Sequence, residues 1–334
     1  MVRLRRVRID APGWSRRRAG RGFVYLDLDR SRIVDEEHLE RITTLAIPPA
    51  WKDVWISPWP NGHIQAAGLD DAERRQYLYH QQWTRRRARL KHDRVLEIAR
   101  RLPGARRRVR AHLELEGMPR EKVLALAFRL LDLAYLRVGG EGYALQHGSY
   151  GLATLLRSHV RVLAPEHDGD PGRVHLHFPA KSGQVRDTVV EDDDVATIVR
   201  TLVRRRDEGE ELLAWRDDAG TWHDVTSADV GAYVKLQLGP EATPKDFRTW
   251  HATVLAARGL ADAGAPPTSE RARRRVVTEV VREVAEELGN TPAVCRASYI
   301  DPRIIDLWEH GRTIRPTRSQ AVAEKETLRL LSAG

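Results

Sequence analysis

Four residues of this 334-residue chain carry side chains that can act together on a phosphate ester: Arg137, Lys181, Arg248 and Tyr299. An arginine guanidinium binds phosphate oxygens through a planar fork of donors, a lysine can donate a proton, and a tyrosine oxygen can serve as a nucleophile. Taken alone, each also has a purely structural interpretation, as a helix-end cation, a solvated turn lysine, a paired buried charge and a core aromatic, respectively. The prediction of a common site therefore depends on their combination, their order and the elements that carry them.

Two elements are expected around the first pair of residues. An apolar stripe over residues 121–136 predicts a helix that ends immediately before Arg137. Strand-like residues at 174–178 and 185–190 flank the turn sequence Pro-Ala-Lys-Ser-Gly. This pattern predicts a β-hairpin with Lys181 at its tip.

The C-terminal part of the chain is expected to be helical. Apolar residues at three- and four-residue spacing predict a long helix over 269–289, with Gly289 as its C-cap. A polar cap followed by Pro292 then predicts a new helix, with Tyr299 about two turns into it. Shorter helices are expected at 192–206 and 227–238.

The N-terminal part has a different pattern. Short strands bounded by proline and Asn-Gly turns are expected at 22–26, 54–56 and 63–67. A helical pattern follows from Trp83 to Arg101, so the character of the chain changes near residues 80–90. We therefore expect an α+β fold, with a small β-rich domain over 1–85 and a mostly α-helical domain over 86–334 that contains the β-hairpin.

The charge of the chain points to a polyanionic partner. The formal net charge is +9 and the isoelectric point is about 9.9, and much of the excess is arginine in clusters. A solvated surface explains any single arginine cluster equally well, so the prediction of a polyanionic partner depends on all the clusters taken together. The clusters lie at residues 16–18, 85–87, 106–108, 204–206 and 273–275.

Cofactors and membrane insertion are not expected. The single cysteine, Cys295, excludes an internal disulfide and a cysteine-based zinc site. His175 and His177 alternate on the expected strand, but no third ligand is evident, so no metal site is predicted. The chain has no apolar run of membrane length, and no hydrophobic signal segment follows its basic N-terminus. A cytoplasmic protein without a cofactor is therefore expected.

Taken in order, the candidate residues resemble the active-site residues of type IB DNA topoisomerases, most closely the small bacterial and poxvirus-like branch. The N-terminal half is similar to the DNA-clamping domain of that branch, through residues 47–56, 63–66 and 76–80. The resemblance runs from about residue 20 to about residue 310. The matching segments of the second half are Arg137-Val138-Gly139, Lys181, Lys245-Asp246-Phe247-Arg248-Thr249, Gly289-Asn290-Thr291-Pro292 and Ser298-Tyr299.

The resemblance implies a chemistry for these residues. Tyr299 would attack a backbone phosphorus and form a 3′-phosphotyrosyl intermediate, while Arg137 and Arg248 would hold the non-bridging oxygens. Lys181 would act as general acid to the leaving 5′ oxygen. One phosphodiester is exchanged for another, so religation would need neither ATP nor a metal ion. The implied partner is double-stranded DNA, which a monomer would enclose as a clamp in the nucleoid.

Two further sets of positions follow from the resemblance. Asn290 stands nine residues before the tyrosine, where many family members have histidine. Its amide can donate a hydrogen bond to a phosphate oxygen, but without charge, so it is expected to stabilise the transition state less. Gln76, Tyr77 and Tyr79 match family positions that contact DNA, with ordinary strand pairing as the alternative interpretation.

Two other functions are compatible with parts of the pattern. A tyrosine recombinase shares the arginine, lysine and tyrosine set, but it typically has histidine three residues before the second arginine, where this chain has Lys245. It also carries a helical domain in front, not a β-rich one. A catalytically inactive, nucleoid-type DNA-binding protein would be expected to lose at least one of the four main residues, and all four are present.

Overall fold

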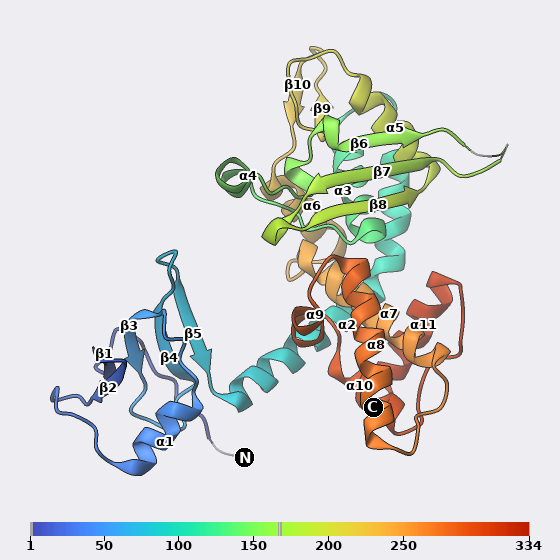
Figure 1. Cartoon of the computed structure of the whole chain (residues 1–334). Helices are drawn as coiled ribbons and strands as arrows, with labels where there is room; N and C mark the ends of the chain where they lie inside the picture. The colour runs from blue at the N-terminus through green and yellow to red at the C-terminus, as the bar shows by residue number, and fades with distance from the viewer. Residues whose placement is uncertain (1–2, 166, 168, 334) are drawn as a thin grey trace. The chain divides into compact units, whose positions relative to one another are not determined.

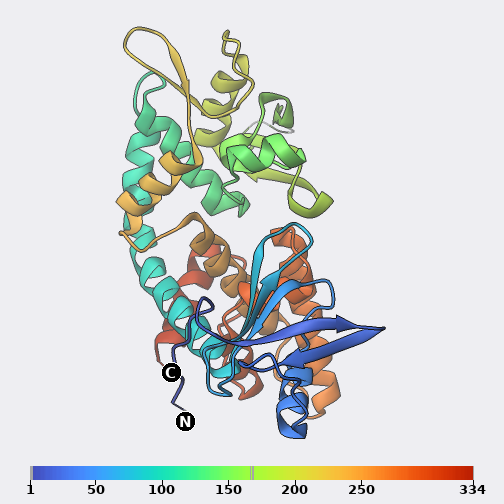
Figure 2. The same cartoon turned by 90° about the vertical axis from the view of Figure 1, so that its left-hand side faces the viewer.

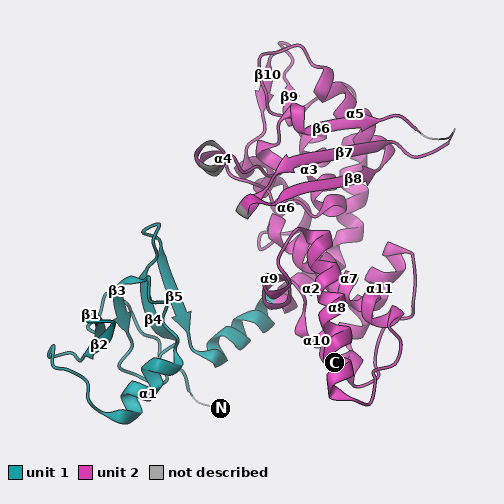
Figure 3. Cartoon of the chain, in the orientation of Figure 1, with its two compact units in different colours: residues 1–91 teal, residues 92–334 magenta. Residues whose placement is uncertain are grey.

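The computed structural model describes residues 3–165, 167 and 169–333. Its packing divides the chain into two compact units, residues 1–91 and 92–334 (Figure 3). The predicted domain boundary lies between residues 85 and 86, and the two units meet a little further along, inside helix α2 (Gln81–Leu113). An antiparallel sheet in the first unit and a mostly helical second unit confirm the α+β class.

The first unit is a five-stranded antiparallel sheet with one helix packed on it (Figure 1). Trp14, Ile56 and Ala66 of the sheet form its core with Ile42 of the helix. The strand order is β2-β1-β3-β4-β5, and the strands expected at 22–26, 54–56 and 63–67 correspond to β2, β3 and β4. The elements are β1 (Trp14–Ala19), β2 (Gly22–Leu26), α1 (Glu36–Thr44), β3 (Lys52–Ile56), β4 (Ile64–Leu69) and β5 (Arg75–Tyr79).

Helix α2 is one continuous helix in both views and is longer than the expected 83–101 (Figures 1 and 2). Pro103 lies inside it, where it removes one backbone donor and crowds the preceding turn. The helix continues because Ala105, Val109 and Leu113, beyond the proline, are buried on one face in the core of the second unit. Tertiary packing therefore outweighs the local cost of the proline.

Helix α3 (Arg120–Ala134) is central to the second unit, because its side chains are buried almost without interruption. The helices expected at 121–136, 192–206, 227–238 and 269–289 are confirmed within a few residues, as α3, α5, α6 and α8. No helix in the part of the chain that the structure describes is long and apolar enough to cross a membrane. The remaining helices are α4 (Glu141–His147), α5 (Asp193–Arg204), α6 (Ser227–Leu238), α7 (Pro244–Asp262), α8 (Glu270–Leu288), α9 (Pro292–Ser298), α10 (Pro302–Glu309) and α11 (Gln320–Ser332).

Helix α7 carries Arg248 and was not expected as a helix. Most of its residues are buried, from Asp246 near its start to Ala261 near its end. A helix that is buried all round has no polar face, so the amphipathic pattern used to detect helices is absent. A start signal was nevertheless present, because Thr243 caps the helix, Pro244 occupies its first turn and the Asp246 carboxylate accepts from Thr243.

The hairpin expected around Lys181 is confirmed and belongs to a three-stranded antiparallel sheet. The strands are β6 (Val160–Leu163), β7 (Arg173–Pro179) and β8 (Val185–Glu191), in that spatial order. The sheet packs on α3 and α5 (Figure 1). A separate two-stranded hairpin is formed by β9 (Ala214–Arg216) and β10 (Trp222–Asp224).

Candidate active site

One open cleft of the second unit, with a volume of about 430 Å³, is lined by all four residues that the sequence combined. Arg137 follows α3, Lys181 lies in the β7–β8 turn, Arg248 is on α7 and Tyr299 follows α9. The structure therefore brings together side chains from distant parts of the sequence. Lys245, from the first turn of α7, also lines this cleft.

The arginines of this region are held where two helices end. Helix α3 ends at Ala134 and α8 at Leu288, and the last carbonyl groups of a helix lack partners within the helix. The negative ends of two helix dipoles thus face a group of positive charges and stabilise it without neutralising it. Arg186 donates to the carbonyls of Glu287 (2.7 Å) and Ala134 (3.0 Å). Arg248 donates to the carbonyl of Tyr135 and, over 2.8 Å, to the carbonyl of Leu288. Arg137 donates to the carbonyl of Gly289 (3.2 Å).

Arg248 is the most deeply buried of these arginines, with 3% of the residue exposed. Burial, assisted by the nearby charge of Arg137, lowers its pKa to about 10, so it remains charged at neutral pH. Tyr135, whose carbonyl accepts from Arg248, has a φ of 54°, the left-handed conformation that commonly ends a helix. In the described part of the chain the buried Nε of Arg248 has no hydrogen-bond partner.

Arg137 is bonded directly to Asn290. Its Nη2 donates to the Asn290 Oδ1 over 2.5 Å, and the buried Asn290 Nδ2 has no partner among the described residues. The segment after Arg137 lies against Gly151, where a Cβ added at Gly139 would approach the Gly151 Cα to 2.9 Å. Gly139 also has a φ of 82°, so glycine is needed there for both reasons.

Tyr299 lies about two turns after the start of α9, as expected, but it stands at the end of that helix and not inside it. Helix α9 ends at Ser298, and Tyr299 is its C-cap. Asp301 directly precedes Pro302 and is extended, as a residue before proline prefers, so α9 cannot continue into α10 and must end before Asp301. The end of the helix leaves Tyr299 in the cleft, with 8% of the residue exposed.

Two cations lie over the ring of Tyr299. The Arg248 Cζ is 5.1 Å and the Lys245 Nζ is 5.5 Å from its centroid. Burial alone would raise the pKa of the phenol. The charges of Arg248, Lys245 and Arg137 outweigh burial and lower the pKa of Tyr299 below its ordinary value.

Lys181 is exposed at the tip of its hairpin, in the short turn Lys181–Gly183. The turn is closed by a bond from the Ala180 N–H to the Gln184 carbonyl, over 2.7 Å. Arg186 fixes β8 to the ends of α3 and α8, as described above. The tip thus presents a solvated ammonium to the cleft from a hairpin that is anchored nearby.

Lys245 is the residue of the cleft that sequence reasoning missed. The sequence predicts no role for it, although it is part of the matching segment 245–249 and stands where recombinases have histidine; in the structure it lies beside both Tyr299 and Arg248. The signal was the Lys-Asp-Phe-Arg spacing, because residues three apart on a helix share a face. That signal required α7 to be recognised as a helix.

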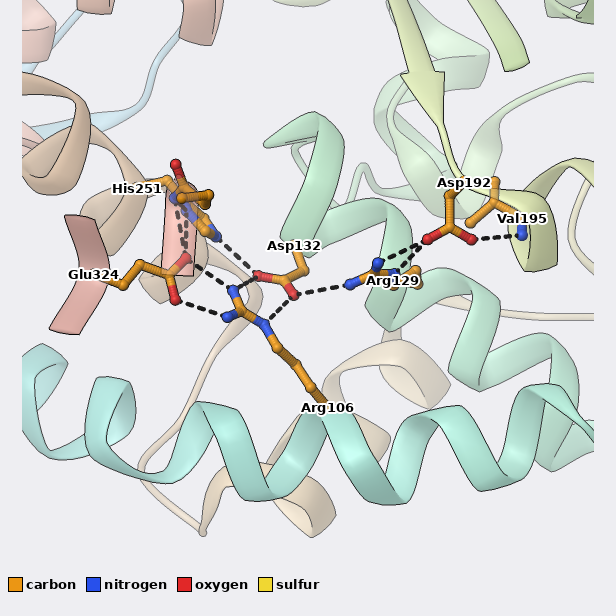
Figure 4. A network of polar contacts seen from close by, with 8 residues as sticks. Arg106, Arg129, Asp132, Asp192, Val195, His251 and Glu324 are labelled. Atoms are coloured by element: carbon orange, nitrogen blue, oxygen red, sulfur yellow. Dashed lines mark hydrogen bonds and ion pairs between the residues drawn. The ribbon is translucent and has the colours of Figure 1, made fainter. Parts of the chain in front are cut away.

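A buried ion-pair network joins the helices α3 and α7, which lead to Arg137 and carry Arg248, to two further helices (Figure 4). The Asp132 carboxylate of α3 accepts from Arg106 of α2 (2.7 Å) and from His251 of α7 (2.9 Å), and Arg106 also bonds Glu324 of α11. Burial raises the pKa of Asp132, but Arg106 and His251 outweigh it and hold this pKa well below its usual range. The network joins four helices, and His251 lies one turn after Arg248.

The arginine clusters divide into structural and exposed members. Arg106 belongs to the buried network, Arg16 donates to backbone carbonyls such as that of Trp51 (2.7 Å), and the Arg205 side chain is fully buried. By contrast, the side chains of 85–87 are exposed on the first turns of α2. Only part of the clustered positive charge is therefore free to meet a polyanion.

The three predicted DNA contacts lie on β5, an edge strand of the first unit. Tyr77 and Tyr79 share one face, are 38% and 42% exposed, and stack with ring centroids 5.9 Å apart. Gln76 lies on the other face, and its amide donates to the Asp70 carboxylate over 2.8 Å. The structure therefore joins the two tyrosines in one exposed aromatic pair and separates Gln76 from them.

Comparisons with known proteins agree on one family. Residues 80–318 match the family model described as eukaryotic DNA topoisomerase I, catalytic core, and residues 22–70 match that of the bacterial DNA topoisomerase IB N-terminal domain. A relative from Acanthamoeba polyphaga mimivirus, named DNA topoisomerase 1B, is 28% identical over 305 residues. That alignment covers 90% of this chain and 88% of the relative. The larger of the two family matches covers more than half of the chain and contains every residue that lines the cleft.

Proposed function

The chain belongs to the type IB DNA topoisomerases, and we propose that it relaxes supercoiled duplex DNA by cutting and resealing one strand through Tyr299. The observation that carries this proposal is the cleft in which Tyr299 lies under Arg248 and Lys245, with Arg137 and Lys181 in the same lining. The reaction needs a tyrosine nucleophile, cationic groups that stabilise negative charge on the phosphate oxygens, and a proton donor, and the cleft is lined by side chains that could supply all three.

In the first step the Tyr299 oxygen attacks a backbone phosphorus in line with the 5′ oxygen. The bond from phosphorus to the tyrosine oxygen forms as the bond to the 5′ oxygen breaks, which leaves a 3′-phosphotyrosyl link and a free 5′ hydroxyl. The lowered pKa of Tyr299 supports this role, because it increases the fraction of phenolate at neutral pH. The phosphodiester energy is retained in the link, so religation requires no ATP.

Arg137 and Arg248 would bind the two non-bridging oxygens as negative charge builds on them. Both are bonded to neutral oxygens of the chain, so neither has lost its charge to a carboxylate. The unpartnered Nε of Arg248 adds a donor that a phosphate oxygen could accept from. Asn290 would contribute through its Nδ2, because its Oδ1 is already occupied by Arg137.

Lys181 would protonate the 5′ oxygen as it leaves, and would take the proton back when the 5′ hydroxyl attacks the phosphotyrosine. Its exposed position at an anchored hairpin tip suits a group that reaches its target only when DNA is bound. Between the two steps the free end of the cut strand would rotate. The arginines supply the positive charge, so no metal ion is needed for this chemistry.

The proposed partner is double-stranded DNA, held by a monomer that closes around it in the nucleoid. The basic charge of the chain and the exposed arginines at 85–87 suit the phosphate backbone. Tyr77 and Tyr79 would contact the DNA through their exposed faces. Gln76 would need to exchange its bond with Asp70 for a bond to a base edge.

The test is a relaxation assay with supercoiled plasmid in EDTA, without ATP. A ladder of topoisomers is expected from the wild-type protein, and none from Tyr299→Phe. That variant should still bind DNA, because it removes one hydroxyl. Retarded but fully supercoiled DNA with the wild-type protein would instead indicate a binding protein, and relaxation by Tyr299→Phe would exclude Tyr299 as the nucleophile.

A further inference from the structure

Two histidines and one carboxylate lie together on the outer face of the β7–β8 hairpin. His175 and His177 share that face because they are two residues apart on a strand, and the residues between and beside them pack inward. Asp187 on β8 is the direct partner of His177 in the strand register. The sequence shows only the two histidines, because the third group is supplied by strand pairing.

The donor atoms are close enough to share one ion. The His175 Nε2 lies 2.8 Å from the Asp187 Oδ1, and the His177 Nδ1 lies 3.1 Å from the Oδ2. One ligand atom from each of the three residues lies within 4.8 Å of the others. In a tetrahedral site with metal–nitrogen distances of about 2.0–2.1 Å, ligand atoms are about 3.3 Å apart. Small rotations of exposed side chains would bring these atoms to that spacing.

We propose that His175, His177 and Asp187 form a binding site for a divalent transition-metal ion such as Zn²⁺ or Co²⁺. Two imidazoles and one carboxylate suit these ions, whereas Mg²⁺ and Ca²⁺ prefer oxygen ligands. Three protein ligands leave at least one position for water. The side chains are 28%, 60% and 62% exposed, so the ion can reach them from solvent. None of the three residues lines the cleft, and the site is independent of the proposed reaction.

Two arginines lie near the site, and only one of them opposes the binding of a cation. Arg186 precedes Asp187 on β8, but it faces the opposite side and donates to the carbonyls at the helix ends. It therefore does not compete for the Asp187 carboxylate. Arg161 on β6 is exposed and pairs directly with His175, so its positive charge opposes the binding of a cation.

The second hairpin of this unit offers a matched control. The His223 Nε2 lies 2.8 Å from the Asp217 Oδ2, with exposures of 43% and 30%, close to those of the proposed site. Within the described residues, no third ligand joins this pair. The two hairpins therefore differ in the number of ligands and not in the kind of contact.

The experiment is a titration of the untagged, full-length, chelator-treated protein with Zn²⁺ and with Co²⁺, at a pH where histidine is neutral. Calorimetry should show one bound ion, and Co²⁺ should develop visible absorption bands. His177→Ala and Asp187→Asn should each weaken binding at least about tenfold, since changes even to residues behind a ligand cost about that much. Arg161→Ala should tighten binding, and His223→Ala should leave it unchanged.

Three results would overturn the proposal. The wild-type protein could bind neither ion, Asp187→Asn could bind as tightly as the wild type, or His223→Ala could abolish binding. Circular dichroism and melting of each variant show that it is folded, which is expected because all the substituted side chains are at least partly exposed. An excess of Mg²⁺ should not displace Co²⁺ from the wild-type protein.

Discussion

Two groups of arginines lie within the second unit, and they differ in what they are bonded to. Arg137 and Arg248 in the cleft donate to carbonyl and amide oxygens, which carry no net charge. Arg106 and Arg129, outside the cleft, donate to the carboxylates of Asp132, Glu324 and Asp192 (Figure 4). The first group keeps its positive charge available, and the second has it compensated.

In an arginine-rich chain, the type of partner therefore separates the arginines that can act on a ligand from those that stabilise the fold. Burial does not make this distinction, because Arg248 is more buried than Arg106. Sequence clustering does not make it either, since Arg106 stands in a triplet and Arg248 stands alone. Substitutions in the two groups should consequently affect different properties.

The largest effect is expected for Arg248→Ala. Loss of one preorganised donor to a developing oxyanion slows a reaction about 10²–10³-fold, and DNA binding should change much less. Arg248→Lys should restore little, because an ammonium cannot reproduce the planar fork. Single-turnover cleavage and band-shift assays measure the two properties. Equal losses of binding and cleavage would show that Arg248 only holds DNA.

The next effect is on stability and concerns Arg106→Ala. Asp132 would lose a partner while it remains buried, which costs about 3–5 kcal/mol in the free energy of unfolding. Urea denaturation measures this loss, and the folded fraction should still relax DNA. Arg107→Ala is the control, because Arg107 is the exposed neighbour on the same helix. A stable Arg106→Ala protein that cannot cleave DNA would break the distinction between the two groups.

A smaller effect is expected for Lys245→Met. Removal of this cation raises the pKa of Tyr299, because Lys245 is one of the charges that lower it. The acid limb of the cleavage-rate profile should then move to higher pH, and cleavage at neutral pH should be about tenfold slower, less than for loss of a direct donor. Lys235→Met, an exposed lysine on α6 outside the cleft, should leave the profile unchanged.

The smallest effect is expected for Arg282→Ala. Arg282 is bonded to the carboxylates of Glu279 and Glu286 on the exposed face of α8. It thus resembles Arg106 in its partners but not in its surroundings, and exposed ion pairs contribute little. Neither the melting temperature nor the relaxation rate should change measurably. A clear fall in either would mean that carboxylate pairing matters regardless of burial.

The sequence predicted best those elements whose signals are local. The long helix α8 has an apolar stripe and a glycine C-cap, and the hairpin of β7 and β8 has strands of alternating burial around a turn. Both could be read without knowledge of the rest of the fold. The four main residues of the cleft could also be chosen in advance, but from their resemblance to a family rather than from physics alone.

The features that were missed depend on tertiary context. Helix α7 is buried along most of its length, so its sequence has no amphipathic pattern that would predict a helix. Because the helix was not predicted, the place of Lys245 in the cleft was not predicted either. The end of α9 before Tyr299 was not predicted, although Asp301 precedes Pro302 and such a residue disfavours the α region. Asp187 joins His175 and His177 only through the pairing register of two strands, which the sequence does not display.

The acceptors that hold the cleft arginines have a consequence for mutational robustness. Because Arg248 and Arg186 are bonded to main-chain carbonyls at the ends of α3 and α8, no side-chain substitution can delete those acceptors. The arrangement is vulnerable instead to changes in backbone path. Gly289, with a φ of 58°, ends α8 in a conformation that L-residues rarely adopt. A replacement there would therefore displace the neighbouring carbonyls that orient the guanidinium groups of Arg137, Arg186 and Arg248.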